Sequence, residues 1–193
     1  MRPNGCRCVP PNAPPTKSKD SRARAGMPDL APSFEIGPRL NLRLGQGKDW
    51  KVDFRVPVRA VVALEAGARV LGWNVEPLLN ADVELGGYKL GLQAGPLWGD
   101  RRLHEQLYGV APVYATVERP AYGARAGYGG WQATAGFSRR FDRFWLGAFV
   151  RHDSVARAAF EASPLVKSRH NTAVGVAMSW VFVRSEARVS EAR

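Results

Sequence analysis

Few residues of this chain have types that could do chemistry, and the group closest to a catalytic motif is His152-Asp153-Ser154. A hydrolase triad combines a serine nucleophile, a histidine base and an aspartate, with the histidine placed in space between the other two side chains. Three consecutive residues cannot take up that arrangement, although His152 and Ser154 would share one face of a β-strand. The sequence therefore predicts no catalytic residues.

Ligands for metals and cofactors are equally scarce. His104, His152 and His170 are far apart in the sequence, and none has a second ligand at close spacing. Cys6 and Cys8 have no further cysteine or nearby histidine with which to complete a tetrahedral zinc site. The glycine-rich runs match neither of the phosphate-loop spacings. We therefore expect no metal and no cofactor.

The net charge of +11 raises the question of nucleic-acid binding. Residues 1–30 and 184–193 together carry +5 of this charge, which leaves +6 on the rest of the chain. That remainder has no basic stripe with interleaved aromatic residues, the pattern on which bases stack. We expect no nucleic-acid partner.

The elements that would position any site are β-strands, and the longest covers residues 50–64, WKVDFRVPVRAVVAL. Its even positions are all apolar, and its odd positions begin with Lys51, Asp53, Arg55, Pro57 and Arg59. A period of two is that of a strand with one apolar and one charged face. Ordinary strands run about five or six residues, whereas a tilted transmembrane strand needs about nine to eleven. Residues 50–64 therefore predict a strand of a membrane barrel.

The same alternation recurs over residues 34–44, 71–83 and 171–183. An alternating apolar face points inward in a soluble barrel or sandwich and outward in a membrane barrel. Strand length and the charges at intervals of two favour the outward arrangement. We predict an all-β, antiparallel, up-and-down transmembrane β-barrel, complete or incomplete, over residues 33–184. The expected lipid-facing residues are Leu40, Leu42, Val52, Phe54, Val56, Val58, Val174, Val176 and Phe182, and the expected lumen-facing residues are Arg39, Arg55, Arg59, Glu76 and Asp82.

Five tryptophans lie near the predicted strand ends, namely Trp50, Trp73, Trp98, Trp145 and Trp180. Outer-membrane barrels carry aromatic girdles at these levels, where the strands meet the two bilayer interfaces. The alternative is that these side chains fill the ends of a soluble core. Prolines at 38, 57, 77 and 96 each remove a ladder donor and predict bulges or breaks. A simple hairpin register places Arg59 opposite Glu76 and Glu84 opposite Lys89.

The alternation weakens after residue 99. Residues 104–110 are consistent with another strand, and residues 111–121 and 153–170 form irregular connections. About nine strands result, and three strand steps between the two connections place them at opposite ends of the barrel. Residues 1–32 are rich in Pro, Lys, Arg and Ser and predict a disordered tail with no apolar signal-peptide core. Residues 185–193 predict a second polar tail.

Several short segments resemble the MipA/OmpV family of Gram-negative outer-membrane proteins, also called MltA-interacting proteins. They occur in family order: Glu35-Ile36-Gly37-Pro38-Arg39-Leu40, Tyr108-Gly109-Val110, Arg119-Pro120-Ala121-Tyr122 followed by Gly127-Tyr128, Ser163-Pro164-Leu165-Val166, and a last strand closing on Trp180-Val181-Phe182. The resemblance implies an outer-membrane β-barrel without known catalytic residues. It also implies a scaffold that brings a murein-degrading lytic transglycosylase together with a murein synthase.

The expected function is that of a non-enzymatic protein of the cell outer membrane, with membrane lipid and possible murein enzymes as partners. Two alternatives from other classes stay open. Charged lumen residues could line a pore for transport, although the interior of a small barrel is filled by its own side chains. An outer-membrane lipid hydrolase would rest on His152 and Ser154 alone.

Overall fold

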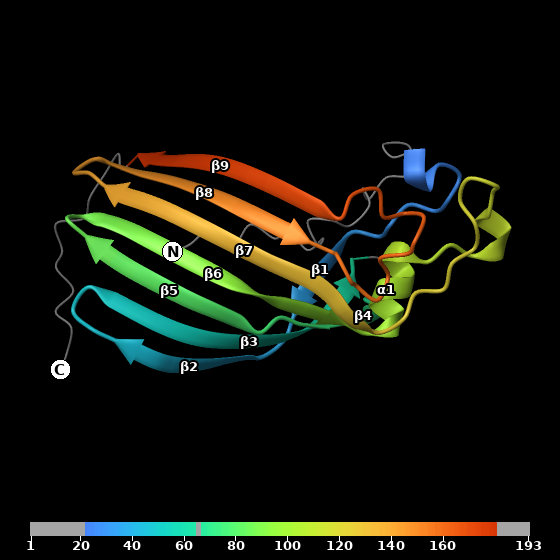
Figure 1. The fold of residues 1–193 in the computed structure, drawn as a ribbon, viewed down its shortest axis with the longest axis horizontal. Coiled ribbons are helices and arrows are strands. Elements are labelled where there is room, and N and C mark those ends of the chain that lie inside the picture. Colours follow the sequence, from blue (N-terminus) through green and yellow to red (C-terminus); the bar gives the residue numbers. More distant parts are fainter. Residues whose placement is uncertain (1–21, 65–66, 181–193) are drawn as a thin grey trace.

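A computed structural model describes residues 22–64 and 67–180 of the chain. Nine antiparallel strands form one sheet, as Figure 1 shows, and the prediction of an all-β, antiparallel, up-and-down architecture is confirmed. The strands are β1 (Ser33–Ile36), β2 (Arg39–Gln46), β3 (Trp50–Ala63), β4 (Val70–Val75), β5 (Leu78–Leu85), β6 (Tyr88–Gly99), β7 (Gly127–Arg140), β8 (Phe144–Ser154) and β9 (His170–Trp180).

Two of the predicted proline breaks divide long strands into shorter ones. β1 and β2 both pair with β3 and are separated at Gly37-Pro38, while β4 and β5 are separated at Glu76-Pro77. Pro57 and Pro96 stay inside β3 and β6. When each divided pair is counted as one line, the sheet has seven lines, and β2 and β9 lie at its two edges.

The register of the hairpins follows the prediction at one end of the sheet and departs from it at the other. Glu84 lies opposite Lys89 as expected. Arg59 lies opposite Asn74 and not opposite Glu76, so the pairing differs from the prediction by two residues, and a bulge between Val61 and Val62 changes the register along this pair of strands. A bulge adds a residue to one strand only, and hydrophobic alternation does not report it.

Residues 104–110 are not a strand, contrary to the prediction. They belong largely to helix α1 (Arg101–Tyr108), whose N-cap Asp100 accepts a hydrogen bond from the Leu103 backbone N–H at 2.8 Å. Leu103 and Leu107 are both buried on one side of the helix. Residues spaced by four share one face of a helix. In a segment as short as 104–110, this spacing is hard to distinguish from the apolar pattern of a buried strand. No helix in the described part of the chain is long and apolar enough to cross a membrane.

The helix changes the position of the two long connections. Without a strand at 104–110, the chain crosses the sheet once less, so both connections emerge at the same end, contrary to the prediction. The backbone N–H of Ala159 donates to the carbonyl of Tyr128 at 2.7 Å, and Ser163 Oγ donates to the carbonyl of Tyr108 at 2.6 Å. Figure 1 shows these segments gathered with α1 beside the ends of β4 and β8.

Ordered structure begins before residue 33, so the predicted disorder of residues 1–32 is wrong for the described residues 22–32. They include the 3-10 turn η2 (Arg22–Arg24). Met27 and Leu30 are buried in apolar clusters with side chains of the long connections, contacts that local composition does not reveal. Residues 1–21, Phe182 and the predicted tail 185–193 lie outside the described residues.

Candidate functional site

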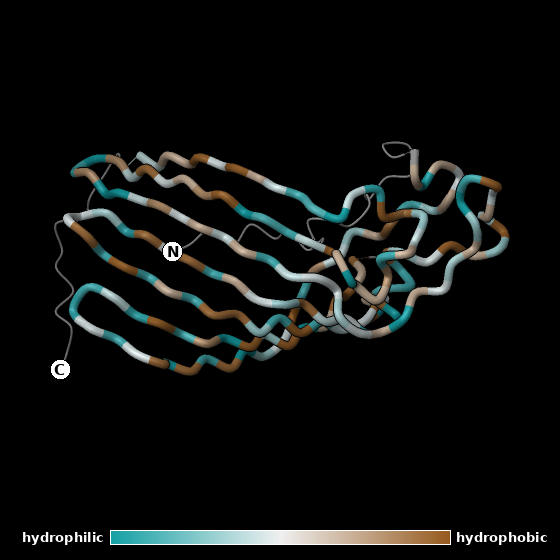
Figure 2. Tube along the Cα trace, in the orientation of Figure 1, coloured by the Kyte–Doolittle hydropathy of each residue, from teal (hydrophilic) through white to brown (hydrophobic). Residues whose placement is uncertain are grey.

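The outer face of the sheet is apolar and exposed. Register places Val52, Phe54, Val56 and Val58 of β3 on this face, in rows with apolar residues of the neighbouring strands. On the edge strands, Val174 is 80% and Val176 is 76% exposed, and Leu40 and Leu42 are exposed too. Figure 2 shows the alternation of apolar and polar residues along the strands. Large apolar side chains on the exposed face are the reverse of a soluble sheet, which turns this face to its core.

Aromatic side chains bound this apolar face at both ends. Trp50 and Trp180 lie on it near the hairpin turns, and Trp73 and Trp98 lie on it near α1. About ten residues of β3 separate Trp50 from the partner of Trp73, which corresponds to ~33 Å of strand. A strand tilt of ~40° reduces this to ~25 Å, the height of the apolar band of an outer-membrane barrel.

Two tryptophans differ from the expected arrangement. Trp145 lies near a strand end but on the polar face, because it alternates with Leu146 and shares its register row with Arg140 and Ser179. Trp131, which the sequence reading omitted, lies on the apolar face opposite Pro96 and is 41% exposed. Its position two residues before Ala133 and four before Ala135, on the same face of β7, could have revealed its face.

The inner face carries a network of charged side chains. Asp53 is buried and accepts hydrogen bonds from Arg43 and, at 3.2 Å, from Arg55. Towards the α1 end, Arg59 donates to Glu35 at 2.9 Å. All of these side chains come from the odd positions of β1, β2 and β3, opposite the apolar positions.

The other expected lumen residues also lie on this face or beside it. Asp82 pairs with Lys51 at 3.3 Å, and Glu76 lies 3.9 Å from Arg59, in the break between β4 and β5. Arg39 lies opposite Pro57 at the exposed edge of the sheet. These charged residues thus gather on one face of the sheet, which also carries Glu35 and the Arg151–Asp153 pair.

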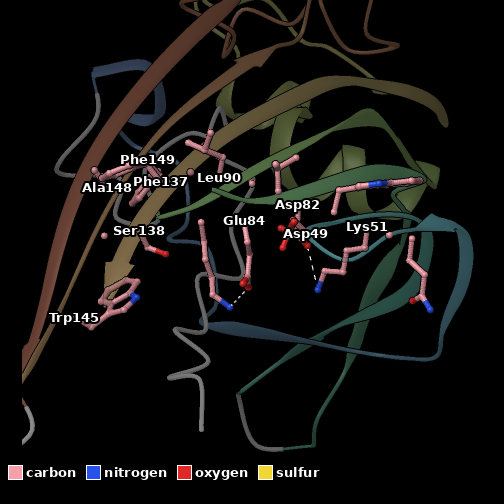
Figure 3. Close-up of a pocket in the computed structure, with 18 of the residues that line it drawn as sticks. Asp49, Lys51, Asp82, Glu84, Leu90, Phe137, Ser138, Trp145, Ala148 and Phe149 are labelled. Atoms are coloured by element: carbon pink, nitrogen blue, oxygen red, sulfur yellow. Dashed lines mark ion pairs between the residues drawn. The ribbon is translucent and has the colours of Figure 1, made fainter. Parts of the chain in front are cut away.

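A pocket of about 550 Å³ opens at the hairpin end of the sheet. Residues of β3 and of every strand from β5 to β9 line it, which shows that the sheet curves around it. Figure 3 shows two ion pairs in its lining, Lys51–Asp82 and Lys89–Glu84, with Trp145 on the opposite side. The pocket can accept water or small polar solutes between side chains of both charges.

The other end of the sheet is covered by a packed region that we call the end lobe, formed by residues 22–32, 100–126 and 155–169. Its core joins α1 to the strand ends and to both connections through a cluster of buried residues: Leu30, Val61, Ala63, Leu71, Leu103, Leu107, Tyr108, Ala124, Val155, Ala158 and Phe160. The backbone N–H of Ala124 donates to the Glu105 carboxylate at 2.6 Å. The lobe thus packs on the strand ends through an apolar core that it shares with β3 and β4.

His104 lies at the centre of this lobe. Its Nδ1 lies 2.7 Å from the carbonyl oxygen of Arg125, and its ring packs edge-on against Phe160 with centroids 4.7 Å apart. Burial lowers the pKa of His104, since the charged imidazolium loses its hydration, and the contact with the Arg125 carbonyl opposes this only in part. His104 is a neutral packing residue and not a candidate catalyst.

The most exposed part of the lobe is a tip formed by residues 111–120, which includes the 3-10 turn η3 (Pro112–Tyr114). Val113 is 80% and Val117 is 102% exposed. Arg119 fixes the base of the tip, because its guanidinium donates to the carbonyls of Tyr114 at 2.8 Å and of Ala25 at 2.9 Å. An apolar tip held by a rigid base is a feature of protein-binding surfaces.

The three residues of the triad motif do not form a triad. Asp153 lies on the inner face and binds Arg151, on the other side of the strand from His152. Ser154 is 2% exposed, and its Oγ accepts a hydrogen bond from the Ala156 backbone N–H at 3.3 Å. His152 contacts Thr172 Oγ1 at 2.9 Å. His152 and Ser154 therefore each bind a different partner and form no hydrogen bond with each other.

Two of the three histidines that are distant in sequence are neighbours in space. The pairing of β8 with β9 stacks the rings of His152 and His170 at 5.8 Å between centroids, a proximity that their distance in the sequence does not predict. A connection of fifteen residues separates the two strands, and sequence spacing does not give their register. Within the described residues, no group of three or more candidate ligands could hold a metal ion.

Comparison with known proteins agrees with this architecture. The family model described as "MltA-interacting protein MipA" matches residues 9–182, which cover the sheet and the end lobe. Neither the curated proteins nor the solved structures gave a match. Since the family match extends over most of the chain, the chain belongs to the MltA-interacting protein MipA family.

Proposed function

We propose that this protein is a non-enzymatic component of the cell outer membrane, whose curved sheet lies in the bilayer and whose end lobe binds enzymes of murein remodelling. The observation that carries the membrane part is the exposed apolar band, bounded by Trp50 and Trp180 at one end and by Trp73 and Trp98 at the other. Lipid is the solvent in which such a face is stable, with Trp at the two interfaces.

The scaffold part rests on family membership together with the end lobe. The family description names an interaction with MltA, and we assign this chain a murein hydrolase and a murein synthase as partners. The lobe supplies a surface of the required kind, since Val113 and Val117 project from a base that Arg119 ties to the segment 22–32. Exposed apolar side chains on a fixed frame lose little entropy when a partner covers them.

A pore is the second candidate, favoured by the charged pocket around Lys51 and Asp82 at the hairpin end. The end lobe opposes it, because its apolar core packs against the other ends of β3 and β4 through Ala63 and Leu71. A lipid hydrolase has less support, since Ser154 is buried and its Oγ is bound to the Ala156 backbone N–H and not to His152. The scaffold remains the function that the arrangement supports best.

The deciding experiment is mild crosslinking in outer-membrane preparations, followed by purification of the full-length protein and identification of co-purified murein enzymes. The double variant Val113→Asp/Val117→Asp should abolish the capture of a transglycosylase or synthase, because two charges replace the apolar contacts. Ala121→Asp, an exposed position of the same connection, is the matched control and should capture normally. Equal capture by both variants contradicts binding through the tip. Conductance in planar bilayers without any captured enzyme would instead support the pore.

A further inference from the structure

The outer, apolar face of the described sheet is hollowed across four of its strands. A groove of about 410 Å³ crosses β5, β6, β7 and β8 on the apolar side of the sheet. Its floor is formed by four small side chains, those of Ala81, Ala94, Ala133 and Ala135. Small residues at these four positions leave a hollow at the middle of an otherwise bulky face.

The edges of the groove are formed by larger side chains in the same register rows. Leu79 pairs with Ala94, and Leu92 pairs with Ala135, so each leucine stands beside an alanine. Both leucines are exposed on the outer face, at 49% and 62% respectively. The space is therefore an apolar channel between branched side chains.

One end of the groove is polar. His152 completes the row that runs through Ala94 and Ala133, and it lines the groove directly. Its ring lies 5.5 Å from the ring of Trp131 and 5.8 Å from that of His170. Trp131 belongs to the aromatic level near α1, where lipid headgroups meet the hydrocarbon. The groove thus leads from the apolar band to the headgroup level.

Beyond His152, the turn that leads into β9 carries exposed basic residues. Lys167 and His170 are exposed there, in a turn closed by the hydrogen bond from Ser168 Oγ to the His170 carbonyl at 2.6 Å. Arg169 is paired with Glu161 at 2.6 Å, which leaves the charge of Lys167 uncompensated within this turn. Basic groups at the membrane surface attract anionic headgroups.

We propose that this groove binds one anionic phospholipid, with an acyl chain over the alanine floor and the phosphate near His152, His170 and Lys167. The site rests on the proposed membrane location of the sheet and goes beyond it, because it names a single bound lipid on one part of the wall. Acyl chains supply the apolar occupant, and the phosphate supplies the anion that these basic residues complement. The histidine N–H groups and the lysine ammonium can all donate to phosphate oxygens.

Native mass spectrometry of the full chain in detergent micelles tests the site, with phosphatidylglycerol or phosphatidylcholine of the same chain length as the probe. The unmodified protein should retain one phosphatidylglycerol and about tenfold less phosphatidylcholine, the difference that one charge-assisted hydrogen bond makes. Ala133→Leu should fill the groove and remove retention. Ala148→Leu, at an exposed outer-face position of β8 that does not line the groove, adds the same volume elsewhere and should retain the lipid.

A second variant tests the headgroup without altering the sheet interior. Lys167→Gln/His170→Gln changes only exposed residues of the turn that leads into β9 and should reduce retention of phosphatidylglycerol to the level of phosphatidylcholine. Equal retention of both lipids by the unmodified protein overturns the site, and so does unchanged binding in Ala133→Leu or preferential retention of lipid A. A protein that stays monodisperse without detergent contradicts the membrane wall itself, whereas detergent dependence without lipid preference contradicts only this groove.

Discussion

The ring of Tyr108 on α1 stacks face to face on the ring of Phe160, with centroids 3.7 Å apart and planes 6° apart. Both side chains are 2% exposed, so the contact lies at the centre of the end lobe. It joins the connection after β6 to the connection after β8, which are more than fifty residues apart. The lobe is therefore held together by long-range packing and not by local structure.

Phe160→Ala should loosen the end lobe without unfolding the sheet. Truncating a buried phenylalanine costs about 3–5 kcal/mol, because the cavity also removes the contacts of Tyr108 and His104. Hydrogen exchange should accelerate across α1 and residues 155–169 and stay slow in β6 to β8. Val117→Ala, at a fully exposed position, should change neither region. Loss of protection throughout the sheet would show that lobe and sheet unfold as one unit.

The stability of the lobe should fall in mild acid through His104. Burial lowers the folded-state pKa of His104 below its ordinary value of 6.5, so the opened lobe takes up the proton first. The stabilisation is therefore fully present above pH ~6.5 and is lost as the pH falls from there through the lower, folded-state pKa. Hydrogen exchange of α1, measured between pH 8 and pH 5 and corrected for intrinsic rates, should show this loss. His104→Gln should weaken the lobe at every pH and remove the histidine-dependent slope.

The alternation of apolar and polar residues is the main sequence signal for the strands of this sheet and for the two faces of each strand. A period of two identified β3 and assigned Val52 and Asp53 to opposite faces, since successive side chains of any strand point in opposite directions. The same rule, applied to Trp145 and its neighbours, would have placed this side chain on the polar face. The assignment of a tryptophan to an aromatic girdle therefore depends on which face of the sheet it lies on, as well as on its position along the strand.

The end lobe was harder to predict because its contacts are long-range. The start of α1 did have a local signal, with Asp100 as N-cap and Leu103 and Leu107 spaced by four. The burial of Met27 and the stacking of His152 on His170 have none, because they depend on how distant connections and strands meet. A single misassigned element, 104–110, was enough to place the two connections at opposite ends.

Substitutions on the two faces of β3 should differ in their effect. Val56→Arg puts a charge into the apolar band near mid-strand and should cost about 2–4 kcal/mol. Arg55→Gln removes one of the two arginines that bind Asp53 and should be mild, because Arg43 still donates to the carboxylate. Reversible urea unfolding in lipid vesicles measures both free energies. Equal costs on the two faces would indicate a soluble sheet with a two-sided core.

Arg119→Ala should release the segment 22–32 from the end lobe. The Arg119 guanidinium donates to the carbonyl oxygens of Ala23 at 3.0 Å and Ala25 at 2.9 Å and, on its own connection, to that of Tyr114. Backbone carbonyls lose these partners in the variant and find water only if the segment lifts away, which also exposes Met27. Limited trypsin digestion should then cleave within residues 22–24 faster than in the unmodified protein.

Arg143→Ala, at an exposed hairpin turn between β7 and β8, removes an arginine without touching the segment and should leave the cleavage rate unchanged. Arg119→Lys keeps the positive charge but loses the geometry of the contacts, because one ammonium cannot reach the same set of carbonyl oxygens as the planar guanidinium. Unchanged cleavage in Arg119→Ala would mean that Met27 and Leu30 hold the segment by apolar packing alone.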